Sequence, residues 1–153
     1  MTRSDRILAA AAVSLALAAG TACAADIGQV KVAKGSVTIE RGGQSIPATL
    51  GARLQQRDVV RTGADGSVGI TMSDNSLLSA GPSSEIALDQ YSFDPTTNDG
   101  RFDTKLSKGT LAVVSGRIAK QSPKAMTVHT PGATLGVRGT EFVVSADGGR
   151  SVR

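Results

Sequence analysis

Few residues in this 153-residue chain are of the types that catalyse reactions or bind transition metals. His129 is the one histidine, and it lies in an alternating stretch, residues 126–130, that is typical of a strand. A catalytic triad needs a nucleophile oriented beside its histidine, and the sequence has no Gly-x-Ser-x-Gly pattern to position a serine. A zinc site would need several Cys or His ligands, but Cys23 is the one cysteine. We therefore expect no catalytic residue at His129 and no zinc site.

Carboxylates give no clearer pattern. Asp65, Asp94 and Asp99 lie in turn-rich segments, and Ca²⁺ prefers such oxygen ligands, but the twelve-residue loop with ligands at alternating positions is absent. Nothing in the sequence marks a pair of carboxylates for glycoside cleavage, although such pairs meet only in space. No glycine-rich loop precedes a helix to bind phosphate. The expectation is a non-enzymatic protein with no metal and no cofactor.

The first 25 residues differ from the rest. Arg3 and Arg6 precede an uncharged run, residues 7–19, and small residues follow to position 25. This layout is typical of a secretory signal peptide, here 1–25, with cleavage after Ala24 or Ala25. An uncleaved membrane anchor is the alternative. Lipidation of Cys23 is not expected, because Gly20 stands where a lipoprotein signal has leucine. The sequence thus predicts a periplasmic or secreted protein.

The surface charge gives no evidence for a nucleic-acid partner. The net charge is +4, and the one local basic cluster is Arg117, Lys120 and Lys124. Nucleic-acid binders usually combine a basic stripe with aromatic side chains for base stacking. Aromatic residues make up only 3% of this chain. We expect these charges to form a solvated surface, and the sequence leaves the oligomeric state open.

Short stretches with β character, separated by glycines, follow the signal peptide. Residues 36–40 and 67–72 alternate polar and apolar side chains, as half-buried strands do. The pattern predicts an all-β domain of about ten short strands, either a solenoid-like β-roll or a two-sheet sandwich. Residues 116–124 allow one helical turn at most, because Pro123 interrupts them. Residues 94–101 lack apolar side chains and predict an exposed loop.

The segment 130–143 has the most distinctive pattern. Pro131 and the following glycine predict a turn. Gly136 and Gly139 flank a Val-Arg pair, where we expect left-handed backbone or a close approach of another chain segment. After that corner a strand is expected, with Thr140 and Phe142 on one face and the intervening residues on the other.

Five segments, in order, resemble the FecR domain, the periplasmic domain of ferric-citrate-type sigma regulators. They are residues 35–41 (GSVTIER), 57–63 (RDVVRTG), 74–78 (DNSLL), 108–116 (KGTLAVVSG) and 130–142 (TPGATLGVRGTEF). The resemblance assigns 26–153 to one FecR-like β domain, with the core of the match at 28–145. The residues that match the family's motifs, whose role is structural or partner-binding, are Asp58, Thr62, Gly63, Gly109, Gly116, Thr130, Pro131, Gly136, Val137, Arg138, Gly139, Thr140 and Phe142.

Two departures affect turns. Arg57 and Asn75 each replace a glycine of the family pattern. Asparagine tolerates left-handed backbone, so the turn at Asn75 is expected to survive, whereas Arg57 predicts a different first turn.

The resemblance implies sensing or regulation in the cell envelope. Family regulators carry an anti-sigma segment and a membrane span before this domain, and only six residues precede the apolar run here. We therefore expect a stand-alone exported module that binds another envelope protein through strand edges, the loop 94–101 or the exposed faces of the later strands. The alternative is a module that binds peptidoglycan or another glycan.

Overall fold

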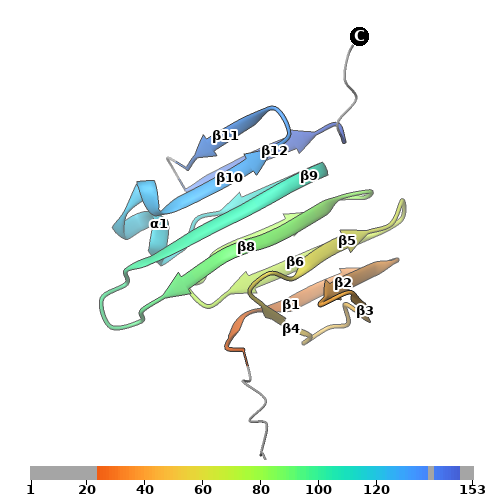
Figure 1. The fold of residues 1–153 in the computed structure, drawn as a ribbon, viewed down its shortest axis with the longest axis horizontal. Helices are drawn as coiled ribbons and strands as arrows, with labels where there is room; N and C mark the ends of the chain where they lie inside the picture. The colour runs from red at the N-terminus through yellow and green to blue at the C-terminus, as the bar shows by residue number, and fades with distance from the viewer. Residues whose placement is uncertain (1–23, 138–139, 149–153) are drawn as a thin grey trace, which may run out of the picture.

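The computed structural model describes residues 24–137 and 140–148, which form twelve strands, one short helix and one 3₁₀ turn. The strands make one continuous sheet that curls over on itself into two layers (Figure 1). Strands account for 60% of the structure and helix for 7%. The all-β prediction is confirmed. In the part of the chain that is described, no helix has the length and apolar character needed to cross a membrane.

The two layers share their longest strand, β9 (Gly100–Val114). Sheet B contains, in spatial order, β3 (Gln44–Pro47), β2 (Val37–Arg41), β5 (Val59–Thr62), β8 (Glu85–Phe93), the first part of β9, β10 (Met126–Thr130) and β11 (Ala133–Gly136). Sheet A contains β4 (Arg53–Gln55), β1 (Asp26–Lys34), β6 (Ser67–Met72), β7 (Leu77–Ala80), the second part of β9 and β12 (Glu141–Ala146). All strand pairs are antiparallel except β9–β10.

Gly109 marks the point where β9 passes from sheet B to sheet A. The strand pairs with β8 up to Lys108 and with β7 from Leu111 onward. Gly109 has φ +91°, and a Cβ placed there would lie 2.1 Å from the Ser84 Oγ. Both the backbone conformation and the close approach therefore require glycine at this corner.

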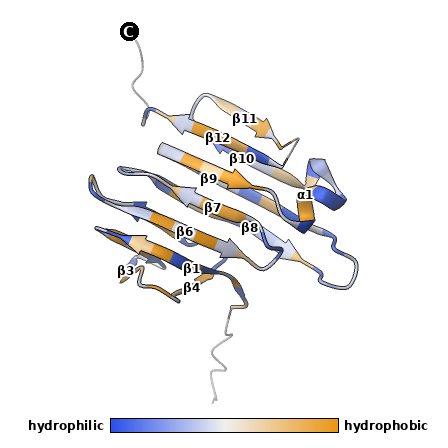
Figure 2. Cartoon of the chain, turned by 180° about the vertical axis from the view of Figure 1, so that it is seen from behind, coloured by the Kyte–Doolittle hydropathy of each residue, from blue (hydrophilic) through white to orange (hydrophobic). Residues whose placement is uncertain are grey.

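The side chains that face inward from both layers form one hydrophobic core. In β6, Val68, Ile70 and Met72 are buried and the residues between them are half-buried, as the alternation predicted. In β12, Val144 is buried, Phe142 is half-buried and Val143 points outward. Figure 2, seen from behind, looks onto the layer made of β1, β6, β7, the second part of β9 and β12.

Three local expectations need correction. The helix α1 (Arg117–Gln121) and the 3₁₀ turn η1 (Pro123–Ala125) give more helical structure than the single turn predicted. Arg57 does adopt the left-handed conformation, with φ +71°, as Asn75 does with φ +66°. The first turn is therefore kept despite its cost for a residue with a Cβ. Gly136 has neither a left-handed backbone nor a neighbour within 4 Å of a Cβ placed there, so that expectation was wrong.

Candidate functional site

Asp58, the first of the motif residues, is buried in an ion pair with Arg41. The Arg41 Nη2 lies 2.6 Å from Asp58 Oδ2, and its Nε donates to Oδ1 at 2.9 Å. The backbone N–H of Gln55 also donates to Oδ2, at 2.8 Å. The hydrogen bonding that Arg41 donates to the Asp58 carboxylate raises the pKa of Arg41 above its ordinary value. The pair joins β2 to the turn before β5, and all the polar atoms of Asp58 point into the protein.

A second buried network surrounds Asp74, which occupies the turn between β6 and β7. The Tyr91 hydroxyl donates to Asp74 Oδ1 at 3.1 Å and accepts from the Asp74 N–H at 2.8 Å. The Ser76 hydroxyl donates to Asp74 Oδ2 at 2.7 Å and accepts from the Gly116 N–H at 2.9 Å. A Cβ on Gly116 would lie 2.4 Å from the Asp74 carbonyl oxygen. This motif glycine therefore lets the chain after β9 pack against the turn.

Burial raises the pKa of the Tyr91 hydroxyl strongly, and the Asp74 carboxylate beside it acts in the same direction. Tyr91 is 6% exposed, and its ring packs edge-on against Phe102 with ring centroids 5.2 Å apart. The phenol is therefore held neutral within the core.

Thr62 and Gly63 lie at the same edge as Gly109, where strands cross between the layers. The Thr62 hydroxyl donates to the Gly81 carbonyl at 2.6 Å and accepts from the Ser84 N–H at 2.8 Å. The Gly63 N–H donates to the Ser36 carbonyl at 2.8 Å. At this edge the chain passes repeatedly from one layer to the other. These hydrogen bonds join the segment after β5 to the segment before β2 and to the segment between β7 and β8.

The last of the five family-like segments, residues 130–142, extends from the end of β10 through β11 into β12. The Thr130 hydroxyl accepts from the Ala133 N–H at 3.1 Å, which closes the turn that Pro131 was predicted to form. Val137 is buried, and the Thr140 carbonyl accepts from the Ser115 N–H at 2.7 Å. Arg138 and Gly139 lie outside the described residues.

The motif residues thus lie in separate places: two buried polar networks, the crossing edge and the β10–β12 segment. The sequence patterns do not mark Arg41, Ser76 or Tyr91 as partners in these networks. Arg41 and Tyr91 each lie 17 residues from the carboxylate that they bind, and Ser76, although only two residues from Asp74, also contacts Gly116, 40 residues away.

The outer surfaces of the two sheets differ in charge. On sheet B, Arg61 bridges Glu40 at 2.8 Å and Glu85 at 3.0 Å, so charged side chains cross neighbouring strands. On sheet A, the outward side chains are mostly small and uncharged. We call the following set the sheet A face: Val32, Lys34, Ser67, Gly69, Thr71, Leu77, Ser79, Thr110, Ala112, Val114, Glu141, Val143 and Ser145.

Lys34 on β1 and Glu141 on β12 are the charged members of this set, and the three strands between them, β6, β7 and the second part of β9, contribute none. Val143, Val32 and Leu77 are 64%, 47% and 44% exposed. The sheet A face is therefore an apolar and hydroxyl-bearing surface, spread over five strands.

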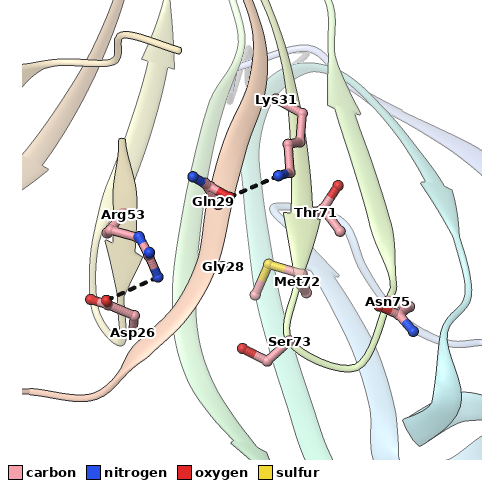
Figure 3. Close-up of a pocket in the computed structure, with 9 residues that line it drawn as sticks. All are labelled: Asp26, Gly28, Gln29, Lys31, Arg53, Thr71, Met72, Ser73 and Asn75. Atoms are coloured by element: carbon pink, nitrogen blue, oxygen red, sulfur yellow. Dashed lines mark hydrogen bonds and ion pairs between the residues drawn. The ribbon is translucent and has the colours of Figure 1, made fainter. Parts of the chain in front are cut away.

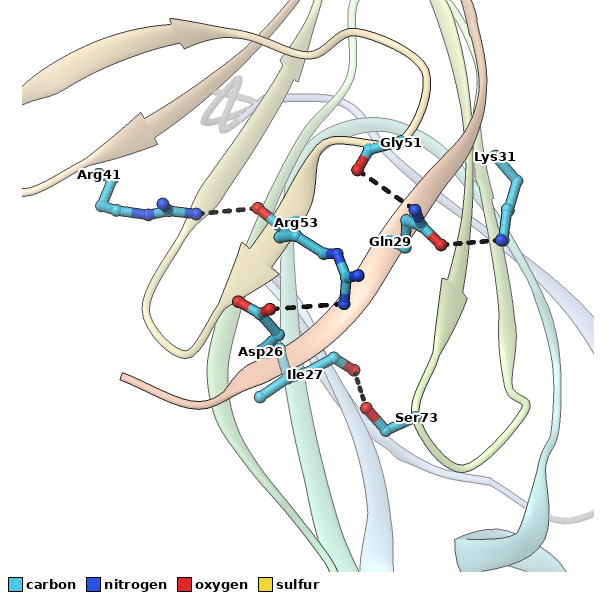
Figure 4. A network of polar contacts seen from close by, with 8 residues as sticks. All are labelled: Asp26, Ile27, Gln29, Lys31, Arg41, Gly51, Arg53 and Ser73. Atoms are coloured by element: carbon cyan, nitrogen blue, oxygen red, sulfur yellow. Dashed lines mark hydrogen bonds and ion pairs between the residues drawn. The ribbon is translucent and has the colours of Figure 1, made fainter. Parts of the chain in front are cut away.

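A shallow groove of about 260 Å³ borders this face where β1, β4 and β6 meet (Figure 3). Arg53 from β4 pairs with Asp26 at 3.5 Å, and Lys31 donates to the Gln29 side chain at 2.8 Å. Figure 4 shows that Arg53 also receives a hydrogen bond on its carbonyl, from the side chain of Arg41, at 3.0 Å. The groove thus offers hydrogen-bonding groups beside an apolar face.

A second hollow, of about 410 Å³, lies between the predicted loop and α1. Pro95 and Asn98 line it from the loop, and Arg117 and Lys120 line it from α1. The loop is shorter than predicted, residues 94–99, because β9 already begins at Gly100. It lies next to two residues of the basic cluster. His129 lies elsewhere, half-buried in β10, with its Nδ1 3.1 Å from the Thr134 hydroxyl.

Comparisons with known proteins give one match, to a protein family. No curated protein and no solved structure matches the chain. The family model described as FecR protein matches residues 58–153, which include three of the five segments that resemble the family and all of a fourth except Arg57. Domains of this family are of a sensing and regulatory type and are typically periplasmic. Because the match covers more than half of its length, the chain belongs to the FecR family.

Proposed function

We propose that this chain is an exported, non-enzymatic FecR-domain protein that binds another protein of the cell envelope. The observation that carries the proposal is the sheet A face. Val32, Leu77, Val114 and Val143 are exposed on four strands of this face, with few charges between them, and exposed apolar side chains gathered on one face often mark an interaction site. Burying a surface with few charges also limits the cost of desolvating charged groups. The opposite layer, with Arg61 between two carboxylates, has the solvated character expected of a free surface.

The adjoining groove supplies specificity in this proposal. Protein interfaces combine an apolar centre with polar groups at the rim. The exposed Asp26–Arg53 pair and the Lys31 ammonium lie at the rim of the sheet A face. A partner with complementary polar groups would be oriented there, while the strands supply the apolar contact.

Site-specific photocrosslinking in cells tests the proposal. A photoreactive residue at Leu77, on the sheet A face, is expected to capture one envelope protein reproducibly. The matched control is Lys105, which is also exposed but lies on sheet B, in the first part of β9. Equal capture by both positions, or none by either, would contradict the assignment of the sheet A face.

Sedimentation with isolated cell wall tests the glycan-binding alternative. Glycan sites commonly stack sugars on aromatic rings, but Tyr91 and Phe102 are buried in the core. A chain that pellets with peptidoglycan and captures no protein through Leu77 would favour the glycan function instead.

A further inference from the structure

The outer edge of β12 differs from the other sheet edges. Within residues 24–137 and 140–148, β12 pairs with β9 alone. The edge strand β3 has four residues and ends in Pro47, and β4 has three residues, with Arg53 in an ion pair. The edge strand β11 has neither proline nor charge, but it is only four residues long. Short length, proline and charge are the usual means of blocking an edge. The six residues of β12 contain no proline, and after Glu141 no charge.

The register with β9 shows which backbone groups of β12 point outward. Ser115 N–H donates to the Thr140 carbonyl, and the two strands continue from there in antiparallel register. In an antiparallel ladder, every second residue directs its N–H and C=O to the same neighbour. Residues 142, 144 and 146 therefore bond to β9. Glu141, Val143 and Ser145 direct their backbone groups away from it.

Beside β12, the space between the two layers is open to solvent. A cavity of about 230 Å³ lies between β11 and β12, lined by Leu135, Gly136, Val137, Phe142, Val143 and Val144. Leu135 is 39% exposed, and Val143 is 64% exposed. A strand added to β12 would bring its inward side chains over this apolar opening.

We propose that the occupant is a second copy of this chain, paired antiparallel through β12 with Val143 on the two-fold axis. In this register Phe142 of each copy lies beside Val144 of the other, over the cavity. Glu141 lies opposite Ser145, so no like charges meet. The pairs 141–145, 143–143 and 145–141 each exchange two hydrogen bonds, about six in total.

The neighbouring register is less favourable. With Val144 on the axis, Glu141 lies opposite Asp147 of the other copy, and like charges directly opposite one another are destabilising. With either Val144 or Phe142 on the axis, only two pairs form between outward-directed residues of β12, whereas Val143 on the axis gives three. The β12 sequence is therefore self-complementary in one register, which is the reason for assigning a second copy. The inference goes beyond the proposed function, because it requires no envelope partner.

A single-cysteine experiment tests both the pairing and its register. We would use the full chain with Cys23→Ser, exported and purified, so that the introduced thiol is the only one. In a hydrogen-bonded antiparallel pair the Cα atoms are about 5.5 Å apart, within the range of about 4.4–6.8 Å that a disulfide spans. Val143→Cys is expected to form a disulfide-linked dimer under mild oxidation. Leu77→Cys, on the same face and also exposed, is the control and should remain monomeric.

The register also predicts which cysteine pairs can form a disulfide between two copies. Glu141→Cys alone should not crosslink, whereas Glu141→Cys combined with Ser145→Cys should. Crosslinking at position 143 that is no faster than at position 77 would overturn the proposal.

Sedimentation equilibrium of the chain without added cysteines provides the second measurement. The full chain is expected to show a monomer–dimer equilibrium that Val143→Lys abolishes and Leu77→Lys leaves intact. Circular dichroism melting confirms that both variants are folded. A wild-type chain that is monomeric at every concentration overturns the proposal. If it is monomeric and Leu77 still captures an envelope protein, the proposed function stands while the second copy is excluded.

Discussion

Arg41 and Asp58 differ in burial, and that difference determines what each contributes. Their side chains are 33% and 1% exposed. Arg41→Ala leaves the carboxylate buried with only the Gln55 N–H, and removing one partner of a buried pair costs about 3–5 kcal/mol in the free energy of unfolding. Asp58→Asn should cost less, because the guanidinium can turn to water. Urea unfolding with Arg53→Ala as control checks this, since the exposed Arg53–Asp26 pair should contribute about 1 kcal/mol or less.

Tyr91 makes a prediction about alkaline pH. Its pKa is raised in the folded chain above the ordinary value of 10.0, chiefly by burial and then by Asp74. The folded state therefore holds its proton more tightly than the unfolded state. The resulting stability is fully present below about pH 10 and is lost as the pH rises through the folded pKa.

Tyr91 is the only tyrosine, so phenolate absorbance reports on it alone. We expect the folded chain to show no phenolate at pH values where the urea-unfolded chain is already half ionised. Above pH 10 the free energy of unfolding should fall less in Tyr91→Phe than in the wild type, because the variant has no phenol to ionise. At neutral pH it should cost about 1–3 kcal/mol, because Asp74 loses a buried donor. A folded tyrosine that titrates like the unfolded one would contradict the assignment.

At the scale of elements, β9 depends on one glycine to serve both sheets. At Gly109, alanine would face both a left-handed backbone and the Ser84 Oγ at 2.1 Å. Gly42 is a matched control, because it has φ +56° and no atom within 4 Å of an added Cβ. Gly42→Ala should cost about 1 kcal/mol for the backbone alone. Gly109→Ala should lower the thermal midpoint clearly further, and equal shifts would show that the corner can relax.

The same strand shows what sequence patterns could and could not predict. Alternation in β6 revealed its buried face, because that pattern is local. The passage of β9 between layers depends on Ser84 approaching Gly109, which no local pattern contains. The partners Arg41–Asp58 and Asp74–Tyr91 are each 17 residues apart, so their pairing was equally invisible. The sheet A face could not be predicted either, because it is defined by the register of five strands, which the sequence does not contain.

At the scale of the molecule, the two layers have unlike outer surfaces, and pairing through β12 would extend only one of them. The two-fold axis would join sheet A of one copy to sheet A of the other, so the two sheet A faces would form one surface. The charged surface of sheet B, with Arg61 and its two carboxylates, would stay outside this surface. A partner would then meet a surface on which Lys34 and Glu141, of opposite sign, are the charged side chains of each copy, although the net charge of the chain is +4.

This combination predicts how binding depends on salt. Contacts of a basic protein with an anionic wall polymer weaken steeply with salt, because the Debye length falls from about 10 Å at 0.1 M to about 3 Å at 1 M. Contact through the sheet A face involves little charge, so the capture yield from Leu77 should change little over that range. Wall sedimentation, measured in parallel, should fall if it reflects charge alone. A Leu77 yield that falls in step with wall sedimentation would mean that the chain's positive charge, and not its neutral face, holds the partner.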